Sequence, residues 1–78
     1  GARLLDVRTP AEYAAGHIQG AINIPVQDLP TRVGELGSDK SKPIVVYCQS
    51  GGRSTHAKRL LEAAGFSKVG NLGGIGRW

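Results

Sequence analysis

PIVVYCQSGGRS, residues 43–54, decides the fold that this sequence predicts. Its first half contains Ile44–Tyr47, an unbroken apolar run, and such a run is typical of a central strand that is covered on both faces. The run ends at Cys48, the only cysteine of the chain, and a glycine pair follows it. The segment therefore predicts a strand, a tight loop and a helix, with the thiol at the point where the strand ends.

Three more segments are short, apolar and bounded by turn residues, which is typical of strands. They lie near residues 3–7, 21–25 and 68–72. Helix signals separate the four strand segments along the chain. Because strands and helices alternate, the sequence predicts an α/β fold, a sandwich around a mostly parallel sheet.

The first helix has a clear start signal. Thr9 supplies a capping hydroxyl, Pro10 occupies the first helical position, and Glu12 lies in the first turn. We expect this short helix to stop at Gly16.

Two further helices are expected, and each is followed by a glycine. The second should run from Val26 or Asp28 to Leu36, and the third from Arg53 to Ala64. The third has the strongest signal, because its apolar residues share one face at helical spacing. These residues are Ala57, Leu60, Leu61 and Ala64.

The composition bounds the function. With 78 residues the chain is expected to be one domain, residues 1–78, with a thin core. The net charge of +4 is spread along the chain, which argues against a nucleic-acid partner and fits a preference for small anions. No apolar run reaches membrane-spanning length, so no membrane partner is expected. No signal-peptide layout is present, and the sequence does not indicate whether the protein is cytoplasmic or exported. One cysteine excludes an internal disulfide and a cysteine-rich zinc site.

The loop after Cys48 has the features of an anion cradle. Its backbone N–H groups can converge on one point, since Gly51 and Gly52 adopt positive φ without penalty, and the following helix start adds partial positive charge. Arg53 adds a permanent positive charge at the rim. These features stabilise a thiolate, so we expect the pKa of Cys48 to lie below the value of about 8.5 of a free thiol. A buried, inert cysteine is the alternative that composition alone favours.

Nearly the whole chain resembles a single-domain rhodanese, a sulfurtransferase. The resemblance implies a three-layer sandwich with a small, mostly parallel sheet and helices on both faces. Family members usually carry one more strand and a helix at the N-terminal end, so the chain is expected to be trimmed there. The matching segments are LLDVRTPAEYAAGHIQGAINIP (4–25), PIVVYCQSGGRS (43–54), LLEAAGF (60–66) and NLGGIGRW (71–78).

The resemblance also implies a reaction. Cys48 would attack the outer sulfur of a small anionic donor such as thiosulfate, carry it as a persulfide, and pass it to cyanide or a thiol, including that of a thioredoxin-like protein. Neither a metal nor an organic cofactor is required, and a monomer is expected. The pocket residues implied are Gln49, Ser50, Gly51, Gly52, Arg53 and Ser54.

Two other functions remain open at this point. A rhodanese fold can serve as a non-enzymatic regulatory or sulfur-sensing module. Cysteine-dependent phosphatases, some of them rhodanese-like, carry five residues between cysteine and arginine, whereas four intervene between Cys48 and Arg53. The tighter loop favours sulfur over phosphate.

The remaining polar candidates have structural alternatives. Arg8 could bind the substrate if it points inward, but a salt bridge to Glu12, four residues later, is the stronger expectation. Glu12 stands where some thiosulfate-using relatives carry a basic residue, and an acid facing the pocket would repel a dianion. We expect His17 to be a structural hydrogen-bonding group rather than a general base. Asp6 should fix neighbouring backbone or the loop, and His56 should face solvent.

Overall fold

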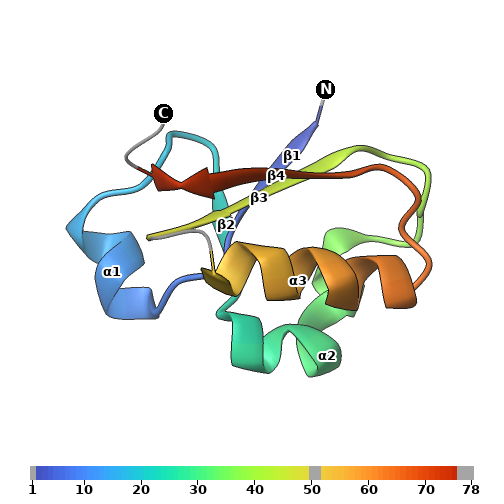
Figure 1. Cartoon of the computed structure of the whole chain (residues 1–78), viewed down its shortest axis with the longest axis horizontal. Helices are drawn as coiled ribbons and strands as arrows, with labels where there is room; N and C mark the ends of the chain where they lie inside the picture. Colours follow the sequence, from blue (N-terminus) through green and yellow to red (C-terminus); the bar gives the residue numbers. More distant parts are fainter. Residues whose placement is uncertain (1, 50–51, 76–78) are drawn as a thin grey trace.

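The computed structural model describes residues 2–49 and 52–75 and shows an α/β fold around a four-stranded parallel sheet (Figure 1). The strands lie in the order β2-β1-β3-β4. The sheet therefore places β3 inside, between β1 and β4, as its continuous apolar run predicts. The strands are β1 (Arg3–Asp6), β2 (Ile22–Asn23), β3 (Ile44–Cys48) and β4 (Val69–Gly74).

Because all the strands are parallel, their carboxyl ends share one edge of the sheet. Asp6 lies beside Asn23 on one side and beside Tyr47 on the other, and Cys48 lies beside Gly74. Loops that leave this edge are where ligands bind in open parallel sheets. The register therefore brings the ends of β1 and β3 together at the edge that the sequence predicts for the site.

Within the described ranges, three α-helices connect the strands: α1 (Pro10–Ala15), α2 (Leu29–Arg32) and α3 (Gly52–Ala63). The capping box predicted for α1 is present, since the Thr9 side chain accepts from the backbone N–H of Glu12 and the Glu12 side chain accepts from that of Thr9. α3 agrees with the predicted third helix to within one residue at each end. At 12 residues it is too short to cross a bilayer, and no other helix in the described part of the chain is long and apolar enough to do so.

The expected second helix is divided into three short pieces. A 3₁₀ turn at Val26–Asp28 precedes α2, and another at Val33–Leu36 follows it. Pro30 explains the first of the two breaks, because it has no N–H to donate to the carbonyl of Val26 and continue a regular α-helix from there.

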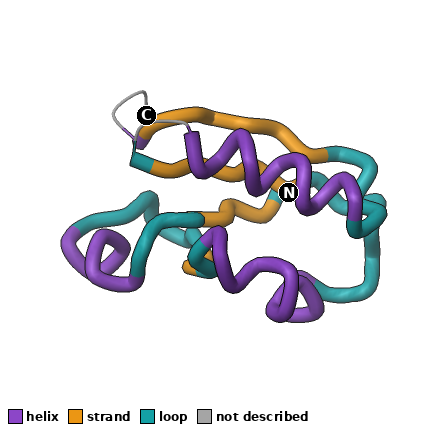
Figure 2. The backbone as a smooth tube through the Cα atoms, turned by 60° about the horizontal axis from the view of Figure 1, so that its bottom comes forward, coloured by secondary structure: helices purple, strands orange, loops and turns teal. Residues whose placement is uncertain are grey.

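The core has two parts, one on each face of the sheet. α2 and α3 lie on the same side of the sheet and cover the larger part (Figures 1 and 2). Successive strand residues point to opposite faces, so Val46 joins this part while Tyr47 joins the smaller one. Tyr13 of α1 packs on the smaller part, so helices contribute to both faces. The larger part consists of Leu5, Val7, Ile24, Leu29, Leu36, Ile44, Val46, Cys48, Ala57, Leu61 and Phe66.

The turn after α3 connects that helix to the core. Gly65 has φ +103°, its N–H donates to the Glu62 carbonyl, and the N–H of Phe66 donates to the Leu61 carbonyl. This pattern is a Schellman motif, and it requires a residue that tolerates left-handed backbone. It delivers the ring of Phe66, 2% exposed, into the larger core.

We expect Gly65→Ala to lower the free energy of unfolding by about 1–2 kcal/mol, because a Cβ is strained at this backbone angle although no atom lies near it. Gly34→Ala is the matched control: its Cβ also meets nothing, and its φ is negative, so stability should stay within about 1 kcal/mol of the parent or rise. Urea unfolding of both variants measures the difference. Equal losses would contradict the role given to the turn.

Candidate active site

Cys48 lies at the carboxyl end of β3, and its side chain is 0% exposed. Its Sγ donates to Oγ of Ser54, 3.5 Å away, in the first turn of α3. The thiol therefore faces the start of a 12-residue helix, where backbone N–H groups and the helix dipole favour negative charge. Ser50 and Gly51, which the sequence assigns to the pocket, lie outside the described residues.

Arg8 is held by a buried ion pair with Asp6. Its Nη2 lies 2.7 Å from Oδ2 of Asp6, and its Nε donates to both carboxylate oxygens at 3.0 and 3.1 Å. The backbone N–H of Arg8 donates to Oδ1 of the same carboxylate. The two side chains are 4% and 0% exposed, and the contact with Asp6 raises the pKa of Arg8.

The rest of the Arg8 guanidinium holds the two segments that flank the site. Nη2 donates to the Gly16 carbonyl at 2.6 Å, and Nη1 donates to Oε1 of Gln49 at 3.2 Å. Gln49 is the residue directly after the thiol, so Arg8 reaches the cysteine loop through a side-chain contact. The expected salt bridge between Arg8 and Glu12 is wrong: Arg8 precedes α1, so spacing by four residues does not align the pair on a helix face.

Glu12 instead binds Arg53. Its two carboxylate oxygens accept from Nη1 and Nη2 of Arg53 at 2.7 and 3.0 Å, a bidentate pair. The carboxylate is also held by Thr9, whose backbone N–H donates to Oε1 at 2.9 Å. The hydrogen bonds from Arg53, then that from the Thr9 backbone, lower the pKa of Glu12 to about 2. Glu12 is therefore ionised at neutral pH, and the charge of Arg53 has a partner.

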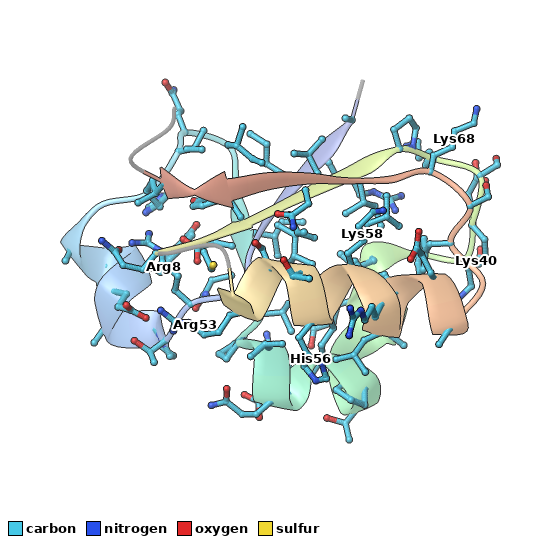
Figure 3. All side chains as sticks on the ribbon, in the orientation of Figure 1. Arg8, Lys40, Arg53, His56, Lys58 and Lys68 are labelled. Carbon is cyan, nitrogen blue, oxygen red and sulfur yellow. The ribbon has the colours of Figure 1, made fainter. Side chains whose placement is uncertain are left out.

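Arg53 interacts electrostatically with the thiol and with Arg8. The hydrogen bonds to Glu12 raise the pKa of Arg53, and the negative charges of Glu12 and Cys48 add to the rise. Desolvation and the positive charge of Arg8 oppose it. Figure 3 shows Arg53 at the start of α3 and Arg8 near it, the latter from the connection between β1 and α1. The site thus contains four charged side chains, Asp6, Arg8, Glu12 and Arg53, around one end of the central strand.

The other polar candidates have structural contacts. His17 donates from Nδ1 to the Tyr13 carbonyl at 2.8 Å, and its ring stacks on the Tyr13 ring with centroids 3.7 Å apart. Tyr47 accepts from the backbone N–H of Ile18, and burial raises its pKa. His56 is exposed, as expected. Among the described residues, no three His, Cys, Asp or Glu side chains gather as a metal-ion site would require.

A family model for the rhodanese-like domain matches residues 1–78. The chain belongs to the rhodanese family. It is 41% identical over 71 residues to the thiosulfate sulfurtransferase PspE of Escherichia coli, an alignment that covers 91% of this chain and 68% of that protein. A solved rhodanese from E. coli, described with anions, superposes with a TM-score of 0.93 at 37% identity and covers 100% of this chain and 92% of its own. The human single-domain sulfurtransferase TSTD1 superposes with a TM-score of 0.85 at 34% identity, over 99% of this chain and 80% of its own.

These relatives confirm the resemblance on which the fold and activity were predicted: the protein is a rhodanese-type sulfurtransferase with an α/β fold. The structure brings Cys48, Gln49, Arg53 and Ser54 of this rhodanese domain to one edge of the sheet, with Gly52 beginning α3. Arg8 lies there as well, bound to Asp6 and Gln49.

The sequence analysis predicted neither of the two ion pairs, Asp6 with Arg8 and Glu12 with Arg53. The pairing of Asp6 with Arg8 had a local signal, since residues two apart on an extended chain point to the same side. The pairing of Glu12 with Arg53 had none, because 41 positions separate the two residues.

The buried pair can be tested by a double-mutant cycle. Arg8→Met leaves the Asp6 carboxylate buried without its cation, so we expect the free energy of unfolding to fall by about 3–5 kcal/mol. The double variant Asp6→Asn/Arg8→Met should lose less than Arg8→Met alone, because no unpaired charge remains. Urea unfolding of both variants and of Asp6→Asn provides the coupling energy. Additive losses would contradict the pairing.

The bond between Glu12 and Arg53 predicts a pH dependence. The folded-state pKa of Glu12, about 2, lies below its ordinary value of 4.5, so the pair's contribution to stability should be fully present above pH 4.5 and disappear as the pH falls towards 2. The difference in melting temperature between the parent and Glu12→Gln should therefore shrink over this interval. A difference that stays constant with pH would show that the charge of Glu12 is not its source.

Proposed function

We propose that Cys48 is the nucleophile of this sulfurtransferase and carries the transferred sulfur as a persulfide. The observation that supports this most directly is the position of the thiol, at the carboxyl end of the central strand and 3.5 Å from Ser54 Oγ in the first turn of α3. Cys48 is the only cysteine in the chain, so it is the only thiol in it that could carry sulfur.

In the first half-reaction the Cys48 thiolate attacks the outer, sulfane sulfur of a donor such as thiosulfate. A bond forms between the two sulfur atoms, and the bond between the donor's two sulfurs breaks. Sulfite leaves with the electron pair, and the enzyme retains a persulfide with an anionic terminal sulfur. The name of the PspE relative supports thiosulfate as a donor.

In the second half-reaction an acceptor attacks the terminal sulfur of the persulfide. Cyanide leaves as thiocyanate, and a thiolate, such as that of a thioredoxin-like protein, leaves as a persulfide. In both cases the Cys48 thiolate is regenerated. No net oxidant or reductant is consumed, and the proposed chemistry takes place on the cysteine sulfur alone.

The surrounding residues stabilise the anionic sulfur. We propose that backbone N–H groups of Gln49–Ser54 form the cradle, in which the start of α3 adds its partial positive charge. Ser54 Oγ lies at contact distance from the sulfur. Arg8 acts through Gln49, to which it donates, so it is a positioning residue rather than a direct ligand of the donor.

Incubation with thiosulfate should raise the intact mass of the protein by that of one sulfur atom, and added cyanide should remove the adduct and release thiocyanate. Cys48→Ser should show neither the adduct nor turnover above the uncatalysed background, because the alcohol is not ionised at neutral pH. Both are read by intact mass spectrometry and a colorimetric thiocyanate assay.

Ser41→Ala is the control for a lost side-chain hydroxyl, since Ser41 bonds to Asp39 in a polar connection outside the site. It should transfer sulfur at the parent rate. If the folded parent protein forms no sulfur adduct with any sulfane donor, the proposed mechanism fails. Hydrolysis of para-nitrophenyl phosphate at a rate that depends on Cys48 would favour a phosphatase instead.

A further inference from the structure

Among the residues that the structure describes, the charged side chains in the ion pairs around Cys48 balance one another. Two guanidinium groups, of Arg8 and Arg53, are paired with two carboxylates, of Asp6 and Glu12. The sum of these four formal charges is zero before the thiolate is counted. An incoming anion therefore meets no excess of positive side-chain charge from this set, and its attraction to the site depends on backbone N–H groups and the helix start.

The two pairs differ in how much they are shielded from solvent. Asp6 and Arg8 are 0% and 4% exposed, whereas Glu12 and Arg53 are 32% and 35% exposed. Only the second pair is thus accessible to a solute that approaches from outside. Figure 3 shows Arg53 at the start of α3, on the side of the helix where α1 lies.

The Glu12 carboxylate is fixed in place independently of Arg53. It accepts from the backbone N–H of Thr9 at 2.9 Å as part of the capping box that begins α1. Its negative charge also acts on Arg8, so its field reaches both guanidinium groups. A carboxylate held in this way opposes an anion that competes for Arg53, and the opposition grows with the charge of that anion.

We infer that Glu12 determines donor specificity: its carboxylate, paired with Arg53, disfavours a dianionic donor such as thiosulfate relative to a sulfane-sulfur donor with a single negative charge, such as a thiosulfonate or a thiol persulfide. The inference rests on the proposed transfer through Cys48. The chemistry is unchanged, since a thiosulfonate R–SO₂–S⁻ gives its outer sulfur to the thiolate and leaves as the sulfinate R–SO₂⁻.

Thiosulfate and methanethiosulfonate form a matched donor pair, because both lose a sulfur–oxygen acid anion and differ by one unit of charge. In Glu12→Gln, kcat/KM should rise roughly tenfold for thiosulfate and about threefold for methanethiosulfonate, because electrostatic energy scales with the charge of the donor. Most of the gain should appear in KM. High ionic strength should reduce both gains, since screening weakens the interaction.

Two variants separate charge from structure. Gln at this position can still accept from the Thr9 backbone, so α1 should keep its start, and circular dichroism checks this. Glu12→Asp retains the charge and should keep the donor preference of the parent. If Glu12→Gln lacks the parent spectrum, the same donor comparison is made with Glu12→Ala.

Glu35→Gln is the matched control for net charge. Glu35 also forms a bidentate pair, with Arg32 at 2.7 and 3.0 Å, and its removal changes the chain's net charge by the same amount. Glu35 precedes Leu36, whose carbonyl accepts a hydrogen bond from Arg3. Arg3 begins β1, whereas the site lies at the other end of that strand. Its kcat/KM should stay at the parent value for both donors.

Equal changes for the two donors in Glu12→Gln, or none, would overturn the inference while leaving sulfur transfer by Cys48 intact. Failure of the parent protein to form a persulfide with either donor would instead overturn the proposed function. The two failures are therefore distinguishable within one set of measurements.

Discussion

The buried ion pair between Asp6 and Arg8 is the interaction on which the site depends. It lies at the carboxyl end of β1, and the same guanidinium holds the Gly16 carbonyl after α1 and Gln49 after the thiol. Separation of two such charges would leave one buried without compensation, which is strongly unfavourable. The pair therefore ties the end of one strand to both segments that surround Cys48.

The parallel sheet provides the platform for this arrangement. Its register places Asp6 beside Tyr47, the residue before the thiol, so the ion pair and the nucleophile come from neighbouring strands. Core packing by α3 keeps the start of that helix against the end of β3, because Ala57 and Leu61 are buried in the same cluster as Cys48. The polar site is thus positioned by apolar contacts on one face of the sheet and by charged contacts at its edge.

The second ion pair, between Glu12 and Arg53, has a different character. It is about one-third exposed, it connects the first turns of α1 and α3, and it engages the cation that follows the cysteine loop. A rhodanese site needs positive potential to hold an anionic sulfur, yet the guanidinium closest in sequence to the thiol has a carboxylate partner. The resulting balance makes backbone N–H groups, rather than side-chain charge, the main source of attraction in the proposed mechanism.

The amino-acid sequence by itself determined those features that depend on neighbours in the chain. The apolar run 44–47 and the capping box at Thr9 and Glu12 are local patterns that appear in the structure where they were predicted. The stripe of the third helix is confirmed for Ala57, Leu60 and Leu61, whereas Ala64 lies after the end of α3 and is exposed. The position of Cys48 at the end of a central strand followed from the same patterns. The break before α2 was missed although Pro30 gave the signal, because the apolar spacing of this segment suits a continuous helix while Pro30 lacks the N–H that such a helix needs.

Only the tertiary structure decided which charges meet. Arg8 could have turned to Glu12 four residues later, and the sequence offered no reason to prefer Asp6 beyond its shared side of an extended chain. Glu12 and Arg53 are 41 positions apart, so their pairing depends on how α1 and α3 pack at the edge of the sheet. Local sequence patterns determine the helix or strand in which a residue lies. The ion-pair partner of a long charged side chain depends instead on which residues the tertiary fold brings within its reach.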